Sequence, residues 1–392
     1  MNFQLSRRSF LQASLATAIS QGLLGCSNSQ VNLQILLLAN SVPLQSIGDF
    51  RREIGKGSQV DFLSQTQLSQ IFDFLLNLQG SKQSNPPKQK LFEQIFSKSK
   101  NYLGVSSLGS YWLSLAIAQN LLQPLKIEGL ANWEKIPTLW QQLGQRDQQG
   151  NISKEGKIYG APYRWGSTVI AYQSDKLEEL GIEIKDWQDL WNPQLRERIS
   201  LLDTPRETIG LTLKKLGYSY NTADLNTVDN LEAELSALDR QVKLYTSDRY
   251  LEPLILGDTW VAVAWSNDIL SLGTRYPQIK FVIPQSGTAL WADLWVKPQT
   301  ELAEAEFLGE LSDRWINFCW SDKPAKQISL FTNGISPALL SMNPKDLPTD
   351  LQDNIFLNSK ILNSDRSEFL LPQSSATQKQ YRDLWLKVRN RE

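Results

Sequence analysis

The most informative absence is histidine, which does not occur anywhere in the 392 residues. Without imidazole there is no Ser-His-Asp or Cys-His catalysis, and metal sites that depend on histidine ligands are excluded as well. Carboxylates or lysine could still serve an enzyme, but the usual general base near neutral pH is missing. We therefore expect a protein that is not an enzyme and that carries neither a metal nor a cofactor.

An excess of either charge is also lacking, because 40 basic residues face 41 acidic ones and the net charge is -1. Nothing in this balance favours a polyanionic partner, so we expect no nucleic-acid binding. The sequence is 41% hydrophobic, and a chain of this length can bury a large core. The length suggests two lobes or domains.

Cysteines are limited to Cys26 and Cys319, so at most one disulfide could form. Cys26 ends the segment Leu23-Leu-Gly-Cys26, which is similar to a lipobox whose cysteine is lipidated and becomes the mature first residue. Lipidation would leave Cys319 without a partner. Because Cys319 shares a helical face with Leu311 and Trp315, we expect a free, buried cysteine and no disulfide.

The segment before the lipobox predicts export. Arg7 and Arg8 lie in Ser6-Arg-Arg-Ser-Phe-Leu11, which resembles the twin-arginine motif, and residues 13–24 are too short and too polar to span a bilayer. A frayed amphipathic helix with a chance arginine pair is the alternative. We interpret residues 1–26 as a signal that sends the protein to the periplasm, where a lipid anchor is its only contact with a membrane.

The rest of the chain alternates apolar runs of strand length with amphipathic stretches of helical length. This alternation favours an α/β fold in which helices cover the sheets. The expected strands are residues 32–39, 102–107, 161–172, 199–202, 260–265, 281–283 and 291–296. The expected helices are residues 111–122, 208–216, 231–238 and 377–388.

Several segments in the middle of the chain resemble the periplasmic spermidine/putrescine-binding proteins of ABC importers. They are Ala161-Pro-Tyr-Arg-Trp-Gly166, Leu190-Trp-Asn-Pro193, Leu201-Leu-Asp-Thr-Pro-Arg-Glu207, Lys215-Leu-Gly-Tyr-Ser219, Val261-Ala-Val-Ala-Trp265 and Leu290-Trp-Ala-Asp293. The likeness extends from about Leu33 to the carboxyl end. It implies a two-lobe, type II-like periplasmic binding protein fold, with a ligand cleft between the lobes that closes about a hinge.

The resemblance also implies how the chain is divided and what it does. Residues 27–164 and 292–343 would form lobe 1, and residues 165–291 and 344–392 would form lobe 2. The implied function is that of the solute-binding component of an ABC importer. As a monomer it would bind a small cationic solute, similar to putrescine or spermidine, and deliver it to a permease in the inner membrane.

Carried over position by position, the likeness assigns a set of aromatic, acidic and polar residues to the ligand site. The set comprises Asn40, Tyr111, Trp165, Thr204, Glu207, Trp265, Trp291 and Asp293. Two of them depart from the family pattern. Asn40 stands where the family has an aromatic and acidic cluster, and Thr204 replaces the acid paired with Glu207. Outside the set, Ser286 replaces another acid and Ile335 falls near an expected tyrosine, so about half of the expected pocket charge is missing.

Asp293 is the stronger candidate for a contact to an ammonium group. A primary ammonium needs a carboxylate within hydrogen-bonding distance, because losing its hydration without a partner is costly. Strand alternation puts Trp291, Asp293 and Trp295 on one face, and each aromatic face adds cation–π attraction of about 0.5–2 kcal/mol. The alternative is a solvent-facing acid between two partly covered tryptophans.

Glu207 has two interpretations that the sequence leaves open. Thr204, Pro205 and Glu207 fit the N-cap, N1 and N3 positions of a helix, which together form a capping box, and a glutamate in that role needs no ligand. The resemblance instead makes Glu207 a ligand contact.

Arg164 is expected to point outward. Its neighbours Tyr163 and Trp165 share the opposite face of their strand, and an arginine in the cleft would repel a polyamine.

Three alternatives to amine binding remain open. The same scaffold could bind a different small solute, or a surface lipoprotein could keep the fold and bind nothing. A secreted hydrolase that uses Glu207 and Asp293 is the third, and it requires the two carboxyls to approach one another across an open cleft.

Overall fold

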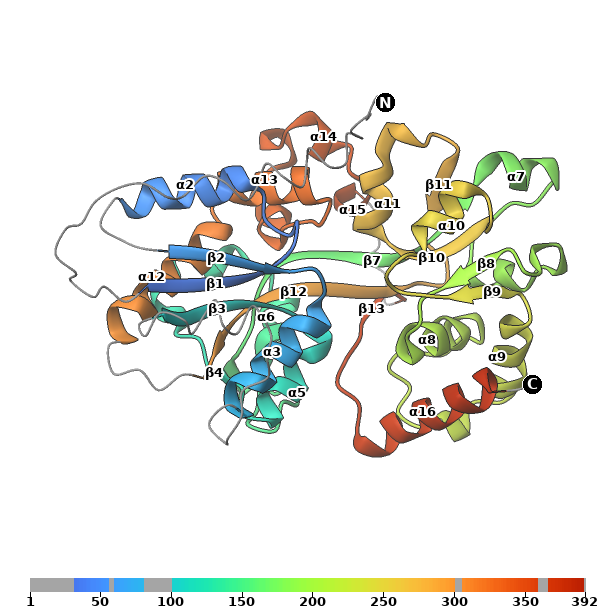
Figure 1. Cartoon of the computed structure of the whole chain (residues 1–392), viewed down its shortest axis with the longest axis horizontal. Helices are drawn as coiled ribbons and strands as arrows, with labels where there is room; N and C mark the ends of the chain where they lie inside the picture. Colours follow the sequence, from blue (N-terminus) through green and yellow to red (C-terminus); the bar gives the residue numbers. More distant parts are fainter. Residues whose placement is uncertain (1–31, 56–59, 81–100, 300–304, 359–365, 391–392) are drawn as a thin grey trace, which may run out of the picture.

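The computed structural model describes residues 32–55, 60–80, 101–299, 305–358 and 366–390 (Figure 1). Arg7, Arg8 and Cys26 lie outside the described residues, so the predictions of export and lipidation stay predictions. Within these ranges none of the helices is long and apolar enough to cross a membrane.

All of the expected strands are present. The larger strands are β1 (Asn32–Leu38), β2 (Val60–Gln65), β3 (Asn101–Gly109), β7 (Ala161–Gln173), β8 (Ile199–Leu201), β9 (Val242–Tyr245), β10 (Val261–Trp265), β11 (Ile279–Val282) and β12 (Ala289–Pro298). They belong to one sheet in the order β2-β1-β3-β12-β7-β10-β8-β9, in which β11 also pairs with β7. The predicted α/β class is confirmed.

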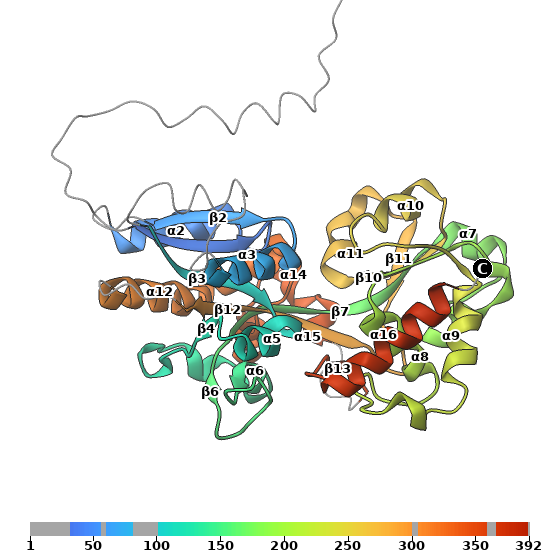
Figure 2. The same ribbon diagram turned by 60° about the horizontal axis from the view of Figure 1, so that its bottom comes forward.

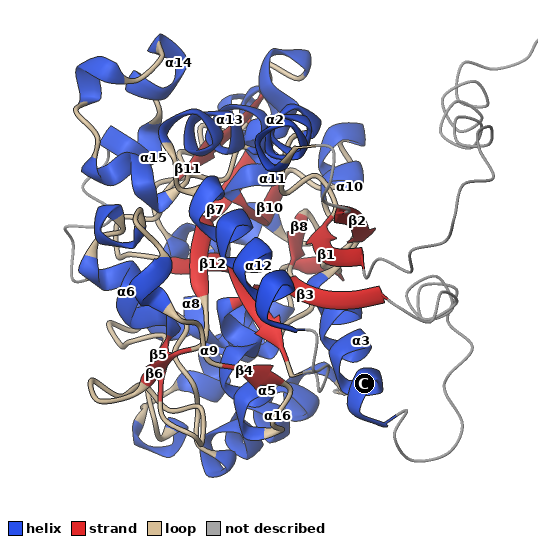
Figure 3. Cartoon of the chain, turned by 90° about the vertical axis from the view of Figure 1, so that its left-hand side faces the viewer, coloured by secondary structure: helices blue, strands red, loops and turns tan. Residues whose placement is uncertain are grey.

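At one end of the sheet β1, β2 and β3 run parallel to one another. The run Asn32-Leu-Gln-Ile-Leu-Leu-Leu38 is buried at its five central positions, as expected for a strand covered on both faces. Helices α2 (Leu44–Ile54) and α3 (Leu68–Gly80) lie on opposite sides of these strands (Figures 1 and 3). This group of elements is lobe 1.

At the other end β8, β9 and β10 are also parallel. The helices here are α8 (Pro205–Lys215), α9 (Leu231–Asp239), α10 (Leu251–Leu256), α11 (Ser266–Leu272) and α16 (Ser375–Arg389). Helices α10 and α11 lie on one side of the strands, and α8, α9 and α16 on the other (Figure 1). This group is lobe 2.

The two lobes share the long strands β7 and β12, which Figure 2 shows between them. Every residue of β7 is buried except Tyr172, because the strand lies at the centre of the sheet. Its first half pairs antiparallel with β12, and its second half pairs antiparallel with β10 and β11. The lobe boundaries expected at residues 164 and 292 fall inside these shared strands, and they stay a prediction.

The remaining elements are shorter or peripheral. They are α5 (Leu113–Ala118), α6 (Thr138–Gly144), α7 (Ser174–Glu179), α12 (Ala305–Cys319), α13 (Asp322–Thr332), α14 (Thr349–Gln352), α15 (Ile355–Asn358), β4 (Leu122–Gln123), β5 (Gln145–Arg146), β6 (Lys157–Ile158) and β13 (Glu368–Phe369). The single helix expected over residues 111–122 is wrong. A 3₁₀ turn at Ser110–Trp112 precedes α5, and Asn120 follows it with a left-handed φ of 56°, which ends the helical path.

Large aromatic side chains fill the core of lobe 1. Trp295 stacks on Tyr163 with ring centroids 3.9 Å apart and packs edge-on against Trp315 at 5.5 Å. Cys319 is free and buried in the same core, as predicted, and burial raises the pKa of its thiol. Aromatic pairs of this kind contribute about 0.5–1.5 kcal/mol each beyond their burial.

A buried arginine ties the carboxyl-terminal helix α16 to lobe 2. Arg206 donates hydrogen bonds to the carbonyl oxygens of Tyr220 and Leu371 and to the hydroxyl of Tyr381 in α16. The same guanidinium lies 5.3 Å from the centre of the Tyr381 ring. These contacts fix the beginning of α8, where Glu207 follows Arg206.

The packing of α8 predicts an unusual response to a glycine substitution. A Cβ at Gly210 would lie 2.1 Å from Cδ1 of Tyr220, whereas a Cβ at Gly48 in α2 would meet nothing within 4 Å. Alanine is favoured over glycine inside helices by about 1 kcal/mol. We expect Gly48→Ala to stabilise the protein by about that amount, and Gly210→Ala to destabilise it by about 1–3 kcal/mol through overpacking. Urea unfolding of the two variants tests this, and stabilisation by both would contradict the packing described for Tyr220.

Candidate functional site

A row of alternate residues on β7 connects the two lobes. Arg164, Gly166 and Thr168 share one face of the strand, because successive side chains point to opposite sides. Their backbone partners on neighbouring strands are Asp293, Trp291 and Trp265, in that order. From Arg164 to Thr168 the strand rises about 13 Å. We call these three residues of β7 the β7 row.

In both lobes the carboxyl ends of the strands point toward this row. β3 and β7 are each antiparallel to β12, so β3 points toward lobe 2. β10 is antiparallel to β7, so it points toward lobe 1 together with its parallel neighbour β8. In open α/β sheets, ligands bind outside the carboxyl ends of the strands. The β7 row is therefore the position in this fold where a ligand site is expected.

At the lobe 1 end of the row Arg164 and Asp293 form a buried ion pair. The Nε atom of Arg164 donates a hydrogen bond of 2.6 Å to Oδ2 of Asp293. The two residues are only 5% and 3% exposed. Burial by itself lowers the pKa of the guanidinium, but its interactions with Asp293, Tyr163 and Asp268 outweigh this effect and the pKa is raised. Burial also raises the pKa of Asp293, and the charge and hydrogen bond of Arg164 oppose that rise.

The outward position expected for Arg164 is wrong. Register places Arg164 directly opposite Asp293, so their side chains share a face. A shift in register between Asp293 and Leu294 then interrupts the ladder, and Tyr163 packs into the lobe 1 core against Trp295. A bulge of this kind cannot be read from alternation within a single strand.

The surroundings of Asp293 also differ from the expected cation-binding position between two tryptophans. Trp295 is fully buried in the lobe 1 core, so it offers no surface to a ligand. Trp291 is half-buried, and the Arg164 guanidinium lies 5.7 Å from the centre of its ring. Asp293 is not a solvent-facing acid either. Within the described residues its carboxylate forms an ion pair with Arg164 alone.

Gly166, at the middle of the row, leaves room for the Trp291 indole. A Cβ at this position would lie 2.3 Å from Cζ2 of Trp291, closer than atoms can approach. The indole therefore lies across the strand where a side chain would otherwise stand. The Nε1 atom of Trp291 is buried without a hydrogen-bond partner in the described part of the chain.

At the lobe 2 end of the row Glu207 faces Thr168. The Thr168 hydroxyl lies 3.1 Å from Oε1 and 3.0 Å from Oε2 of Glu207. Thr204 is the N-cap of α8 and Pro205 occupies its first turn, as predicted, but the Thr204 side chain forms no capping hydrogen bond. The prediction of a capping box is wrong, because the Glu207 carboxylate points toward β7 and not toward the first residues of its own helix.

The electrostatic environment of Glu207 differs from that of Asp293. Glu207 is 7% exposed, and burial raises its pKa to about 7, opposed by interactions with Thr168, the Trp265 side chain and Arg206. Among the described residues no lysine or arginine forms an ion pair with it. A single hydroxyl proton from Thr168 is shared between its two oxygens. Glu207 is thus a buried carboxyl whose charge lacks a cationic partner.

Two further residues of lobe 2 complete the site, and the sequence reasoning missed both. Asp268 on α11 accepts a hydrogen bond from the Tyr250 hydroxyl. The Tyr250 ring packs edge-on against Trp265, with centroids 5.9 Å apart. Burial raises the pKa of Asp268, and interactions with Tyr250 and Arg164 oppose that rise. Its position just after β10, at a strand's carboxyl end, is the signal that could have revealed it.

Asn40 and Tyr111 follow the carboxyl ends of β1 and β3. Asn40 is exposed and left-handed, with a φ of 60°, and Tyr111 is 51% exposed beside Trp112. Trp165 is fully buried and packs against Trp140, on the strand face opposite the β7 row. The contribution of these residues to ligand binding stays a prediction.

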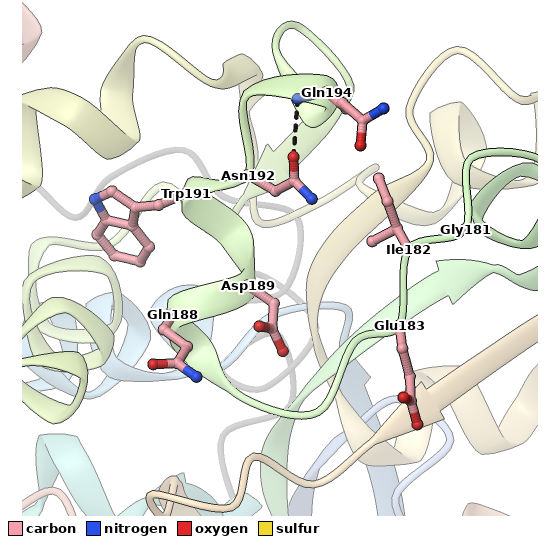
Figure 4. Close-up of a pocket in the computed structure, with 8 residues that line it drawn as sticks. All are labelled: Gly181, Ile182, Glu183, Gln188, Asp189, Trp191, Asn192 and Gln194. Carbon is pink, nitrogen blue, oxygen red and sulfur yellow. Dashed lines mark hydrogen bonds between the residues drawn. The ribbon is translucent and has the colours of Figure 1, made fainter.

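A hollow of about 490 Å³ is formed by residues of lobe 2 (Figure 4). It is lined by residues 181–183, 188, 189, 191, 192 and 194, none of which is a predicted site residue. The carboxylate of Asp189 accepts hydrogen bonds there from the backbone N–H groups of Lys185 and Asp186. In the described ranges no group of three or more acidic or cysteine side chains could hold a metal ion.

Comparisons with known proteins place this geometry in a family. Residues 105–360 match the family described as bacterial extracellular solute-binding protein. The spermidine/putrescine-binding periplasmic protein of Escherichia coli is 29% identical over 60% of this chain and 65% of its own length. The protein of the same name from Salmonella typhimurium is 29% identical over 44% of this chain and 47% of its own length. A putrescine/cadaverine-binding protein of Pseudomonas aeruginosa is 27% identical over 45% and 51%. The chain therefore matches less than two thirds of the length of these curated relatives.

Solved structures extend the likeness in fold over almost the whole chain. The spermidine/putrescine substrate-binding protein PotD of Streptococcus pneumoniae superposes with a TM-score of 0.73 at 20% identity, covering 92% of this chain and 99% of its own. The Tp0655 lipoprotein of Treponema pallidum gives a TM-score of 0.65 at 18% identity, covering 92% and 99%. These neighbours confirm the predicted two-lobe fold. The chain belongs to the bacterial extracellular solute-binding protein family.

Proposed function

We propose that this protein is the solute-binding component of an ABC importer and that it holds a small organic amine of the putrescine and spermidine class. The ammonium group would lie against Glu207, with the carbon chain along the β7 row between Trp265 and Trp291. The observation that carries the proposal is the burial of the Glu207 carboxyl without a cation among the described residues.

A ligand ammonium supplies what Glu207 lacks. Burying a carboxylate without a partner is costly, and a charge-assisted hydrogen bond from an N–H group offsets that cost. The two half-buried indoles of Trp265 and Trp291 offer apolar surface and cation–π attraction of about 0.5–2 kcal/mol each. Micromolar binding corresponds to about 8 kcal/mol, which one desolvated ion pair and two aromatic walls can supply together.

The relatives support the same class of ligand, because their names refer to spermidine, putrescine or cadaverine binding. The family and these names support a periplasmic binding protein that acts with an inner-membrane permease. We extend the proposal to lipidation at Cys26 after export and to a monomeric state, both of which rest on the sequence.

The order of importance of the two acids is reversed relative to the sequence expectation. Asp293 already has Arg164 as its cation, so Glu207 becomes the first ammonium contact. The same pairing weakens the hydrolase alternative, because a carboxylate compensated by a guanidinium is a poor base. A different solute on the same scaffold stays open, and the ligand panel below separates it from an amine.

The first prediction concerns the dependence of amine binding on Glu207. Putrescine and spermidine, each at a hundredfold excess over its Kd, should stabilise the protein by about 2.7 kcal/mol in a thermal-shift assay. Glu207→Gln should weaken binding by about 2 kcal/mol or more, since it removes one member of a desolvated charge pair. Isothermal titration calorimetry measures the loss.

Glu179→Gln is the matched control, because Glu179 is an exposed acid on α7 whose carboxylate lies 3.6 Å from Nζ of Lys176. It should leave amine binding unchanged. If amines leave the melting temperature unmoved while an amino acid or a sugar raises it, the amine proposal is wrong.

The second prediction concerns pH. Glu207 must be ionised to hold an ammonium group, and its pKa in the unliganded protein is about 7. Below that pH, binding has to release a proton from Glu207, so the affinity should fall about tenfold per pH unit between pH 7 and pH 5. Above pH 7 it should level off. Titrations from pH 5 to pH 8 measure this slope, and Glu207→Gln should remove it.

The unliganded protein should respond to pH with the opposite sign. The folded-state pKa of Glu207 lies above its ordinary value of 4.5, so the folded state binds more protons than the unfolded state between 4.5 and about 7. The free energy of unfolding should therefore fall as pH rises through this window, by on the order of 3 kcal/mol from this group. Equal pH profiles for the wild type and Glu207→Gln would contradict the burial of an uncompensated carboxyl.

A further inference from the structure

We propose that the guanidinium of Arg164 occupies the position where a second ammonium group of a ligand would bind. The protein would then bind amines with one charged end more tightly than diamines of the same length. This inference rests on the proposed function, because it takes Glu207 as the contact of the ligand ammonium. It goes beyond that function by assigning specificity to Arg164.

The β7 row has one carboxylate at each end. Glu207 faces Thr168 at the lobe 2 end, and Asp293 faces Arg164 at the lobe 1 end. The two ends are about 13 Å apart along the strand, and the Trp291 indole lies over the position between them. An extended ligand with its first ammonium on Glu207 therefore runs along the row toward Arg164.

The guanidinium is fixed in place from several sides. It is bonded to Asp293, and its charge lies 5.7 Å from the centre of the Trp291 ring. Gly334 packs behind it, since a Cβ on Gly334 would lie 3.1 Å from Cδ of Arg164 and 3.4 Å from Cη2 of Trp291. Asp268 from lobe 2 also attracts the guanidinium. Arg164 is thus held in position by its ion pair and by close packing against Trp291 and Gly334.

Three carboxyls and two guanidiniums act on one another along the row in the described part of the chain: Glu207 and Arg206 at the lobe 2 end, and Asp293, Asp268 and Arg164 at the lobe 1 end. Asp293 is hydrogen-bonded to Arg164 and Asp268 to the Tyr250 hydroxyl. Glu207 forms no ion pair among the described residues, and the attraction of Arg206 is the smallest of the effects on its pKa. The lobe 2 end therefore offers a carboxyl without a hydrogen-bonded cation, whereas the lobe 1 end already holds the guanidinium of Arg164. A second ligand ammonium at that end would meet a like charge in a poorly hydrated environment.

The same arrangement argues against a ligand that carries a carboxylate toward Arg164. Asp293 and Asp268 flank the guanidinium, so an incoming carboxylate would meet two acids together with the one cation. The chemistry that fits the Arg164 end is a neutral or apolar group lying against the indole of Trp291. Among small amines the site therefore favours those with one ammonium group and an uncharged tail.

The test compares ligands that differ by one charge. Calorimetric titration of the purified protein with 1-aminobutane and with 1,4-diaminobutane (putrescine) should show at least tenfold tighter binding of the monoamine. Arg164→Met should reverse the order, because it frees Asp293 for the second ammonium of the diamine. Arg164→Lys keeps the charge beside Asp293 and should keep the preference of the wild type.

The outcomes separate this inference from the function on which it rests. Tighter binding of the diamine by the wild type overturns the role of Arg164 and leaves the proposed function intact. An unchanged preference in a folded Arg164→Met variant, checked by circular dichroism, overturns it as well. If Arg164→Met does not fold, the ratio of the two affinities in the wild type decides alone. Binding of neither amine, nor of spermidine, overturns the proposed function and the inference together.

Discussion

The backbone ladder between β7 and β12 is the constraint on which the rest of the structure depends. It joins two groups of parallel strands into one sheet, and it sets which residues of the two long strands lie opposite one another. The β7 row exists because this pairing aligns Arg164 with Asp293 and Gly166 with Trp291. The carboxyl ends of β3 and β10 then converge on the row from opposite directions, since both flanking pairings are antiparallel.

Two buried carboxylates lie along the β7 row, and they differ in their interaction partners. Asp293 has a guanidinium at hydrogen-bonding distance, which offsets part of the cost of burying its charge, although burial still raises its pKa. Glu207 receives hydrogen bonds from the neutral side chains of Thr168 and Trp265, the attraction of Arg206 is the smallest opposing effect, and burial raises its pKa to about 7. A buried ion pair is weak evidence for stability by itself. The contrast between the two acids is informative. Asp293 has a cation within the fold, whereas Glu207 has no ion-pair partner among the described residues.

Much of the fold could be predicted from the sequence, because strand and helix periodicity are local properties. The run at residues 161–172 has no polar break, and it forms the central strand of the sheet. Cys319 fell on an apolar helical face and is buried there. The helix expected to reach residue 122 ends early because Asn120 adopts a left-handed conformation, which asparagine tolerates but does not signal reliably.

The site could be predicted only in part, because its charges are decided by contacts between distant strands. The resemblance placed Glu207, Trp265 and Trp291 in the site, and the structure brings their strands and helix to one row. The partner of Asp293 could not be predicted, since alternation along β7 says which residues share a face but not which strand lies opposite. The bulge after Asp293 depends on the same register, and so does the separation of Trp295 from the row.

Gly166 affects the shape of the site but carries none of its charges. The Trp291 ring lies in the space that a side chain at position 166 would fill. It can do so because glycine has only a hydrogen atom there. A side chain at position 166 would clash with the Trp291 indole and with Oγ of Ser266, so the indole can lie this close to the strand only over a glycine. A substitution at this position would therefore change the shape of the row without changing its charged residues.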